Sequence, residues 1–92
     1  MLIRLKPFGR FRGPLGEEMD VDLPAGSSVS DLLVRLASFS TDLHAQIFDA
    51  GGQVREDVNV MVNGRHFLSL GGRDAPLEEG DEVALFPAVV GG

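Results

Sequence analysis

Apolar and polar residues alternate along several short segments of the chain, which is the pattern of strands that bury one face. The clearest case is 18–23, where Met19, Val21 and Leu23 alternate with three acidic residues. The same reasoning predicts five strands in all. They cover residues 2–8, 18–23, 58–62, 65–70 and 82–86, of which 65–70 is a short edge segment.

A helical period replaces the alternation over residues 29–39, where apolar residues recur three and four positions apart. Ser28 precedes this segment as a predicted N-cap, and Asp31 places a carboxylate in its first turn. A shorter second helix is predicted over 41–48, with Thr41 as its cap. The first helix needs a sheet to cover its apolar side.

Glycine and proline mark the connections between these elements. Residues 9–16 contain Gly13-Pro14 and are predicted to form a turn, and Asn63-Gly64 is the strongest turn signal in the chain. The first and last strands are apolar-rich, so we expect them to lie side by side and parallel in the middle of the sheet. The order therefore predicts an α+β fold of the β-grasp type, with a mixed sheet of about five strands gripping one main helix plus a short second helix.

Composition adds bounds on compartment and partners. The chain has 92 residues, no cysteine and a net charge of −6. It has no apolar run of about 20 residues and no secretory signal, so we expect a cytoplasmic protein without a membrane span. Like charges repel phosphate backbones and anionic lipid, so we expect no nucleic-acid or membrane partner. A basic protein is the natural electrostatic complement.

The end of the chain is the main candidate site. Pro87 is expected to end the last strand, because it lacks an N–H group for the ladder. We therefore predict a domain over 1–87 and a flexible C-terminal tail over 88–92. At roughly 3.3 Å per residue, this tail lets a carboxylate reach about 16 Å beyond the strand. Gly91 and Gly92 have no side chains and fit a narrow channel in a partner, although glycine-ended tails are more often simply frayed ends.

A second candidate is a surface patch. Alternation places Met61, Ala84 and Phe86 on the sheet face away from the helix, with Phe8 nearby. Exposed apolar patches of this kind usually mark an interface, in which phenylalanine and methionine are enriched. The alternative is that one or two of these side chains tuck under loops.

Other chemistries find little support in the sequence. His44 and His66 lack the spacing of a metal pair, and the acidic run 78–82 lacks the spacing of a calcium loop. The glycine pairs 51–52 and 71–72 are not followed by the Lys-Ser/Thr pair of a phosphate loop. No metal site is predicted.

Three stretches, 26–33, 60–64 and 77–92, together resemble one known family. The chain resembles the ubiquitin-like sulfur carriers of the MoaD/ThiS type, most closely the small subunit of molybdopterin synthase. The L-x-x-G-D-x-V-x-x-F-P run that ends in Gly91-Gly92 carries most of the resemblance. One departure is 88–90, which reads Ala-Val-Val where molybdopterin members more often carry Pro-Val-Ala.

The resemblance implies a protein that is not itself an enzyme and binds no cofactor. Its terminal carboxylate on Gly92 would be adenylated by an E1-like enzyme of the MoeB/ThiF kind, which uses ATP and magnesium. A sulfur donor would then convert the adenylate to a thiocarboxylate, which delivers sulfur in a MoaE-like large subunit. The residues expected to meet these partners are Phe8, Met61, Ala84, Phe86, Pro87, Ala88, Val89 and Val90, followed by Gly91 and Gly92.

Three alternatives remain open at this point. The first is a ubiquitin-like modifier that forms isopeptide bonds through Gly92, and the second is an interaction module without terminal chemistry. The third keeps the sulfur carrier but changes its destination to thiamine, cysteine or tRNA thiolation. All three are compatible with the same residues.

Overall fold

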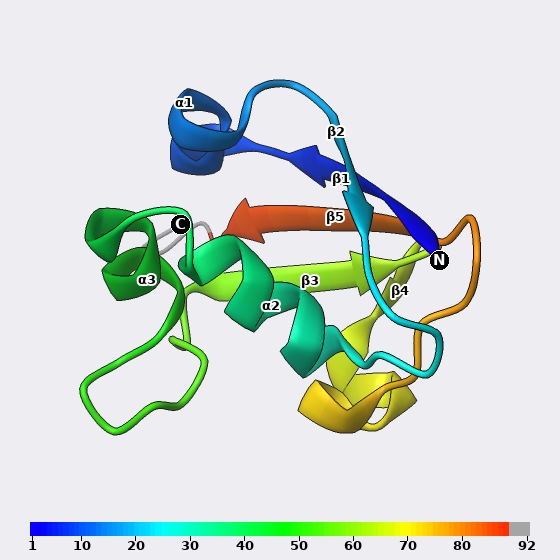
Figure 1. The fold of residues 1–92 in the computed structure, drawn as a ribbon. Coiled ribbons are helices and arrows are strands. Elements are labelled where there is room, and N and C mark those ends of the chain that lie inside the picture. Colours follow the sequence, from blue (N-terminus) through cyan, green and yellow to red (C-terminus); the bar gives the residue numbers. More distant parts are fainter. Residues whose placement is uncertain (89–92) are drawn as a thin grey trace.

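The computed structural model describes residues 1–88, which fold around one mixed sheet (Figure 1). Within that range the sheet has five strands in the order β2-β1-β5-β3-β4. β1 and β5 are parallel, and the other neighbours are antiparallel. The strands are β1 (Leu2–Pro7), β2 (Met19–Asp22), β3 (Val58–Val62), β4 (Arg65–His66) and β5 (Glu82–Pro87).

The predicted inward faces of these strands form the core. Ile3, Leu5, Val60, Val83 and Leu85 have no exposed surface. They come from the three central strands, so the alternation assigned the buried face correctly. The parallel pairing of the first and last strands is also confirmed. Because β5 lies between β1 and β3, the chain reaches Ala88 from the middle of the sheet (Figure 1).

Helix α2 (Val29–Ala37) crosses one face of the sheet and buries its apolar stripe there (Figure 1). Its start is the capping box that the sequence predicted. The backbone N–H of Asp31 donates to Ser28 Oγ at 3.3 Å, and the backbone N–H of Ser28 donates to Asp31 Oδ2 at 2.8 Å. Two of the donors that every helix start leaves unpaired are satisfied in this way.

Helix α3 (Thr41–Ile47) packs against α2. Its cap is Ser40, so the prediction of Thr41 was wrong by one position. The Ser40 Oγ accepts a hydrogen bond from the backbone N–H of Leu43 at 3.0 Å. Both residues are capping types, and the extended backbone of Ser40 decides between them, because an N-cap residue lies outside the helical conformation.

Residues 9–15 are helical, so the prediction of a simple turn over 9–16 was wrong. A 3-10 turn, η1 (Gly9–Phe11), leads directly into a short helix, α1 (Arg12–Leu15). Phe11 and Leu15 lie four positions apart and are both buried, so this segment is anchored in the core. Pro14 is tolerated because its missing N–H falls in the first turn, where no helical partner exists.

The connection from β4 to β5 is also more structured than predicted. The predicted edge segment 65–70 is a two-residue strand followed by the 3-10 turn η2 (Phe67–Leu70), and the predicted loop contains a second turn, η3 (Gly72–Asp74). His66 stops the strand, since its Nδ1 accepts a hydrogen bond from the backbone N–H of Leu68 at 3.2 Å.

The architecture is the predicted β-grasp: a mixed sheet with one main helix held against one face (Figure 1). The Asn63-Gly64 turn is confirmed, with positive φ angles of 50° and 81° at its two residues. None of the helices in residues 1–88 is both long enough and apolar enough to cross a membrane.

Candidate functional site

The face of the sheet opposite α2 carries the predicted surface residues. Four strands place one residue each in a single row across this face. Met61 on β3 is the Cα partner of Ala84 on β5 and of His66 on β4, and Ala84 is in turn the partner of Lys6 on β1. Met61 and Ala84 therefore lie side by side, as the alternation predicted.

Phe8 and Phe86 form the second part of this surface. The backbone N–H of Phe8 donates to the carbonyl of Leu85 at 2.8 Å, which continues the parallel pairing past the end of β1. The two rings meet edge to face, with centroids 6.4 Å apart and planes at 87°. Such pairs are favourable beyond the area that they bury. We name Phe8, Met61, Ala84 and Phe86 the sheet patch.

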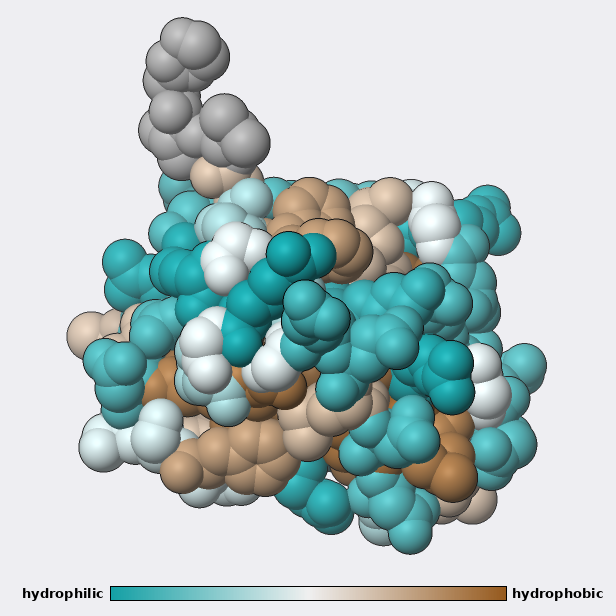
Figure 2. Space-filling model, turned by 90° about the horizontal axis from the view of Figure 1, so that it is seen from above, coloured by the Kyte–Doolittle hydropathy of each residue, from teal (hydrophilic) through white to brown (hydrophobic). Residues whose placement is uncertain are grey.

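The sheet patch is less open than the sequence suggested. Phe8 is 39% exposed, whereas Met61, Ala84 and Phe86 are half-buried. Cross-strand neighbours on one face lie about 5 Å apart and shield one another. Figure 2 looks onto the side of the molecule that is uppermost in Figure 1, not onto this sheet face; on that side, hydrophobic residues form separate areas between hydrophilic ones.

A charged group borders the patch on the β1 side. The Lys6 ammonium lies 3.0 Å from Glu82 and 3.7 Å from Glu18, so it joins β1 to both neighbouring strand segments. The hydrogen bond to Glu82, followed by the charge of that carboxylate, raises the pKa of Lys6 above its ordinary value of 10.5. Lys6 therefore presents a fixed positive charge beside Ala84 at neutral pH.

The site ends at Pro87 and Ala88. Pro87 is the last residue of β5, opposite Val58, and the backbone N–H of Ala88 donates to the carbonyl of Asp57 at 2.7 Å. Ala88, which the sequence assigned to the tail, is thus hydrogen-bonded to the domain. The other predicted tail residues, Val89, Val90, Gly91 and Gly92, lie outside the described residues.

Three residues beside Pro87 and Ala88 were missed by the sequence analysis: Gly9, Arg10 and Asp57. Gly9 packs so closely on Pro87 that an added Cβ would lie 2.8 Å from its ring. Arg10 pairs with Asp57 at 3.1 Å. The segment that holds the first two had been assigned to a turn. The spacing of Phe11 and Leu15 is the signal that could have marked it as ordered.

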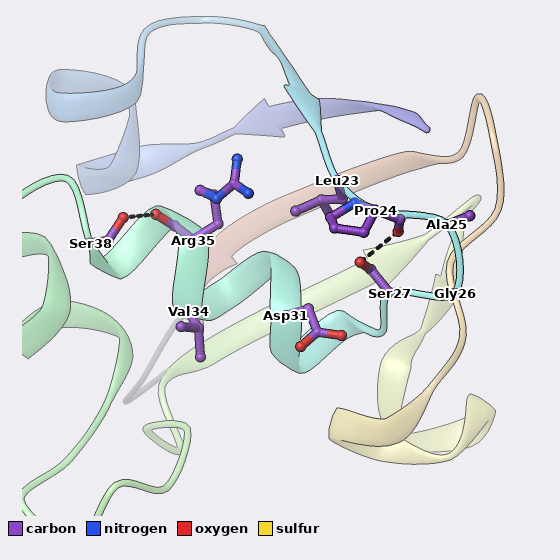
Figure 3. A pocket seen from close by; sticks show the side chains of 9 residues that line it. All are labelled: Leu23, Pro24, Ala25, Gly26, Ser27, Asp31, Val34, Arg35 and Ser38. Carbon is purple, nitrogen blue, oxygen red and sulfur yellow. Dashed lines mark hydrogen bonds between the residues drawn. The ribbon is translucent and has the colours of Figure 1, made fainter.

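A sizeable cavity lies on the other side of the molecule. It measures about 530 Å³ and is bounded by α2 and by the connection from β2 to α2 (Figure 3). Its polar side chains serve local structure. Ser27 Oγ donates to the carbonyl of Pro24 at 2.7 Å, Ser38 Oγ donates to that of Arg35 at 2.6 Å, and Asp31 belongs to the capping box. We assign no chemistry to this cavity.

His66 is hydrogen-bonded locally, and His44 packs against a neighbouring ring. His66 Nδ1 accepts a hydrogen bond from the backbone N–H of Leu68 at 3.2 Å, and Nε2 lies 3.1 Å from the side-chain oxygen of Asn59. The His44 ring packs against Phe48, with centroids 5.4 Å apart. Over residues 1–88, no three histidine or acidic side chains gather closely enough to hold a metal ion.

Comparison with known proteins identifies the family. The sequence model of the ThiS family matches residues 6–92 of this chain. The chain belongs to the ThiS family. The resemblance to ubiquitin-like carriers of the MoaD/ThiS type is thereby confirmed, and with it the β-grasp fold.

Relatives of this ThiS-family chain include proteins of two kinds. It is 33% identical, over an alignment 97 positions long, to small archaeal modifier protein 3 of Haloferax volcanii, with 100% of both chains covered. The crystal structure of SAMP1 from Haloferax volcanii matches with a TM-score of 0.84 and 28% identity over 100% of both chains. A putative molybdopterin converting factor subunit 1 from Pyrococcus furiosus matches with a TM-score of 0.77 and 32% identity over 97% of this chain and 99% of that chain.

Membership in the ThiS family narrows the function to that of a small ubiquitin-like carrier or modifier. Proteins of this kind are generally not catalysts themselves. The sheet patch and the end of β5 are the two surface features that the structure places beside the last described residues.

Proposed function

We propose that this protein is a sulfur carrier that acts through the carboxylate of Gly92 and supplies molybdopterin synthesis. The observation that carries the proposal is the ThiS-family match, which runs through Gly91 and Gly92, on a fold whose last strand is central. A central strand gives the residues that follow it a rigid origin. The 32% identity to a putative molybdopterin converting factor subunit supports the choice of pathway.

The chemistry requires two steps, both carried out by partner enzymes. A carboxylate is a poor electrophile, so an E1-like adenylyltransferase would join the Gly92 carboxylate to AMP and release pyrophosphate from Mg²⁺-bound ATP. Sulfide equivalents from a sulfur donor would then attack the acyl carbon and expel AMP, which leaves a thiocarboxylate. A MoaE-like large subunit would use this group as the sulfur source, and the carrier would return as the carboxylate.

The chain contributes binding and presentation to this cycle. The sheet patch offers two aromatic rings beside the strand that leads to Gly92, and aromatic side chains are enriched in interfaces. Phe8, Met61, Ala84 and Phe86 would dock on the partner, while Pro87 to Val90 lead into its channel. Because the chain has no cysteine, no thiol of its own competes for the activated acyl group.

A second candidate function is protein modification, in which Gly92 forms an isopeptide bond with a lysine of a target. The specific support is the 33% identity, over the full length of both chains, to small archaeal modifier protein 3. Both functions begin with the same adenylate. They differ in whether sulfur or a lysine amine attacks it.

Intact-mass spectrometry of the protein purified from its own cells tests the proposal. We expect a species heavier than the unmodified chain by the difference between sulfur and oxygen, confined to the peptide that contains Gly92. A variant with one alanine added after Gly92 should lack this species, because the added Cβ blocks the channel. The same alanine added before Met1 is the control.

Two results would count against sulfur transfer in molybdopterin synthesis. Peptides in which a C-terminal fragment of this chain, such as the tryptic fragment 74–92, is joined through Gly92 to lysines of other proteins, with no thiocarboxylate, would favour the modifier. Neither product in wild-type cells would favour an interaction module without terminal chemistry.

A further inference from the structure

The place where β5 ends is held by two segments that are distant in the sequence. Gly9 and Arg10 follow β1, and Asp57 precedes β3. The backbone N–H of Ala88 donates to the carbonyl of Asp57 at 2.7 Å. The first residue after β5 is therefore bonded to the segment before β3, the neighbour of β5 on the side away from β1. This is a short hydrogen bond by the standards of backbone pairs.

Gly9 holds Pro87 from the β1 side. A Cβ at position 9 would lie 2.8 Å from Cγ and 3.0 Å from Cδ of Pro87, distances that real Cβ atoms do not keep. Gly9 also has a φ of +58°, which side chains disfavour. Position 9 therefore requires glycine for two reasons, the close approach of Pro87 and the positive φ. The ring of Pro87 packs directly against the backbone of Gly9.

Asp57 is itself held by two cations. Its carboxylate lies 3.1 Å from the Arg10 guanidinium and 3.5 Å from that of Arg55. Arg10 also donates to the carbonyl of Gln46 at 3.4 Å. The side chains of Arg10 and Asp57 are each 36% exposed, so solvent screens the pair and it adds little to the stability of the fold. The effect of the ion pair is geometric, because it holds Asp57, whose backbone carbonyl accepts the hydrogen bond from Ala88.

We propose that Gly9, Arg10 and Asp57 are positioning residues for the activation of Gly92. Together with Pro87 and Ala88 they form what we call the tail clamp, which fixes the direction in which the chain leaves β5. This inference rests on the proposed function. In that function the three residues are given no contact with the reacting carboxylate. They act by holding Pro87 and Ala88.

The effect follows from tethering. Once the sheet patch is docked, the carboxylate reaches the active site at an effective concentration set by the length and stiffness of its tether. When Pro87 and Ala88 are held in place, the tether can take fewer directions, and this raises the effective concentration. Releasing these two residues should therefore reduce the rate of adenylation in the docked complex. It should not weaken docking, because the sheet patch is unchanged.

The test uses the full chain with its E1-like adenylyltransferase and measures the ATP-dependent release of pyrophosphate. For Arg10→Met we expect kcat to fall by about tenfold, below the roughly 10²-fold that a misplacement of about 1 Å can cost. KM should stay within about twofold of wild type, as for unchanged binding. Arg10→Lys, which keeps the charge, should recover most of kcat. Arg35→Met, which removes an arginine bonded to the carbonyl of Asp22 on the helix side, is the control and should leave kcat unchanged.

Gly9→Ala is the second probe, with Gly52→Ala as its control. Gly52 has a φ of +80°, but an added Cβ there would meet nothing within 4 Å. Both variants carry backbone strain, and only the first pushes on Pro87, so only Gly9→Ala should lose kcat. If Gly9→Ala does not fold, Arg10→Met decides alone.

Wild-type kcat in Arg10→Met, or equal losses in the variants and their controls, would overturn the tail clamp and leave the proposed function standing. No activation of the wild-type chain by any adenylyltransferase of its cell would overturn both. The two failures are therefore distinguishable.

Discussion

At the scale of single residues, Phe86 connects the folded domain to the proposed site. The rings of Phe86 and Phe8 meet edge to face, with centroids 6.4 Å apart, and Phe86 lies two positions before Ala88. Its half-buried ring adds contact area to a docking surface, and its removal leaves the core unchanged because the core lies on the other face. Phe86 is thus the side chain of the sheet patch at which docking can be tested with least damage to folding.

We expect Phe86→Lys to weaken binding to the activating enzyme and to the large subunit by about tenfold or more, as for an aromatic anchor in an interface. The reason is that a lysine there removes the apolar contact and places a charge where water is excluded. Isothermal titration of the purified partners measures the change in Kd.

Phe39→Lys is the matched control for this prediction. Phe39 is 51% exposed and follows α2, on the helix side of the sheet. If both substitutions leave Kd unchanged in folded protein, the sheet patch is not the docking surface.

At the scale of elements, α2 depends on its first turn. The Ser28–Asp31 capping box pairs two backbone donors that would otherwise be unsatisfied. Arg35 lies in the last turn, where a positive charge opposes the negative end of the helix dipole. These local features explain why the sequence located this helix well: each depends on residues within a few positions of one another.

Ser28→Ala should destabilise the protein by about 1 kcal/mol, the usual cost of losing a serine cap. For a domain of this size, that loss lowers Tm by about 4–8 °C. Thermal unfolding followed by circular dichroism measures it. Ser28→Thr keeps a capping oxygen and should recover most of the loss, and Ser38→Ala, at the other end of the helix, should change Tm much less. A Tm for Ser28→Ala that equals the wild-type value would show that the capping box is not stabilising.

The whole molecule is organised by β5, which lies between β1 and β3 and buries Val83 and Leu85 completely. The same strand carries Ala84 and Phe86 on the opposite face and leads to Pro87 and Ala88. Core, docking surface and tail clamp therefore share one strand. Damage to the core should move all three together, whereas the substitutions proposed for the surface should not.

We expect Leu85→Ala to destabilise the protein by about 2–5 kcal/mol, because it leaves a cavity among the central strands. That is a large share of the roughly 5–15 kcal/mol that stabilises a small domain. Unfolding in urea measures the shift of the midpoint. Leu68→Ala is the control, since Leu68 is 68% exposed and its truncation creates no cavity. Equal midpoints for the two variants would contradict this description of the core.

The sequence alone determined the features that are encoded locally. The alternation in 18–23 and 82–86, the helical period that starts at Val29 and the Asn63-Gly64 turn each depend on residues that are close along the chain, so the pattern reveals them directly. The Gly91-Gly92 end and the family resemblance also needed only the order of residues. The cap of the second helix was predicted at Thr41 instead of Ser40, because both are capping types and only the backbone conformation separates them.

Tertiary structure alone decided the features built from distant segments. The glycine- and proline-containing stretch that includes Phe11 and Leu15 is helical because these two side chains are buried in the core. Gly9, Asp57 and Pro87 come from three separate parts of the chain, and no local pattern announces their contact. They meet because β1, β5 and β3 lie side by side, and the pairing of strands far apart in sequence depends on the packing of the whole core rather than on any short stretch.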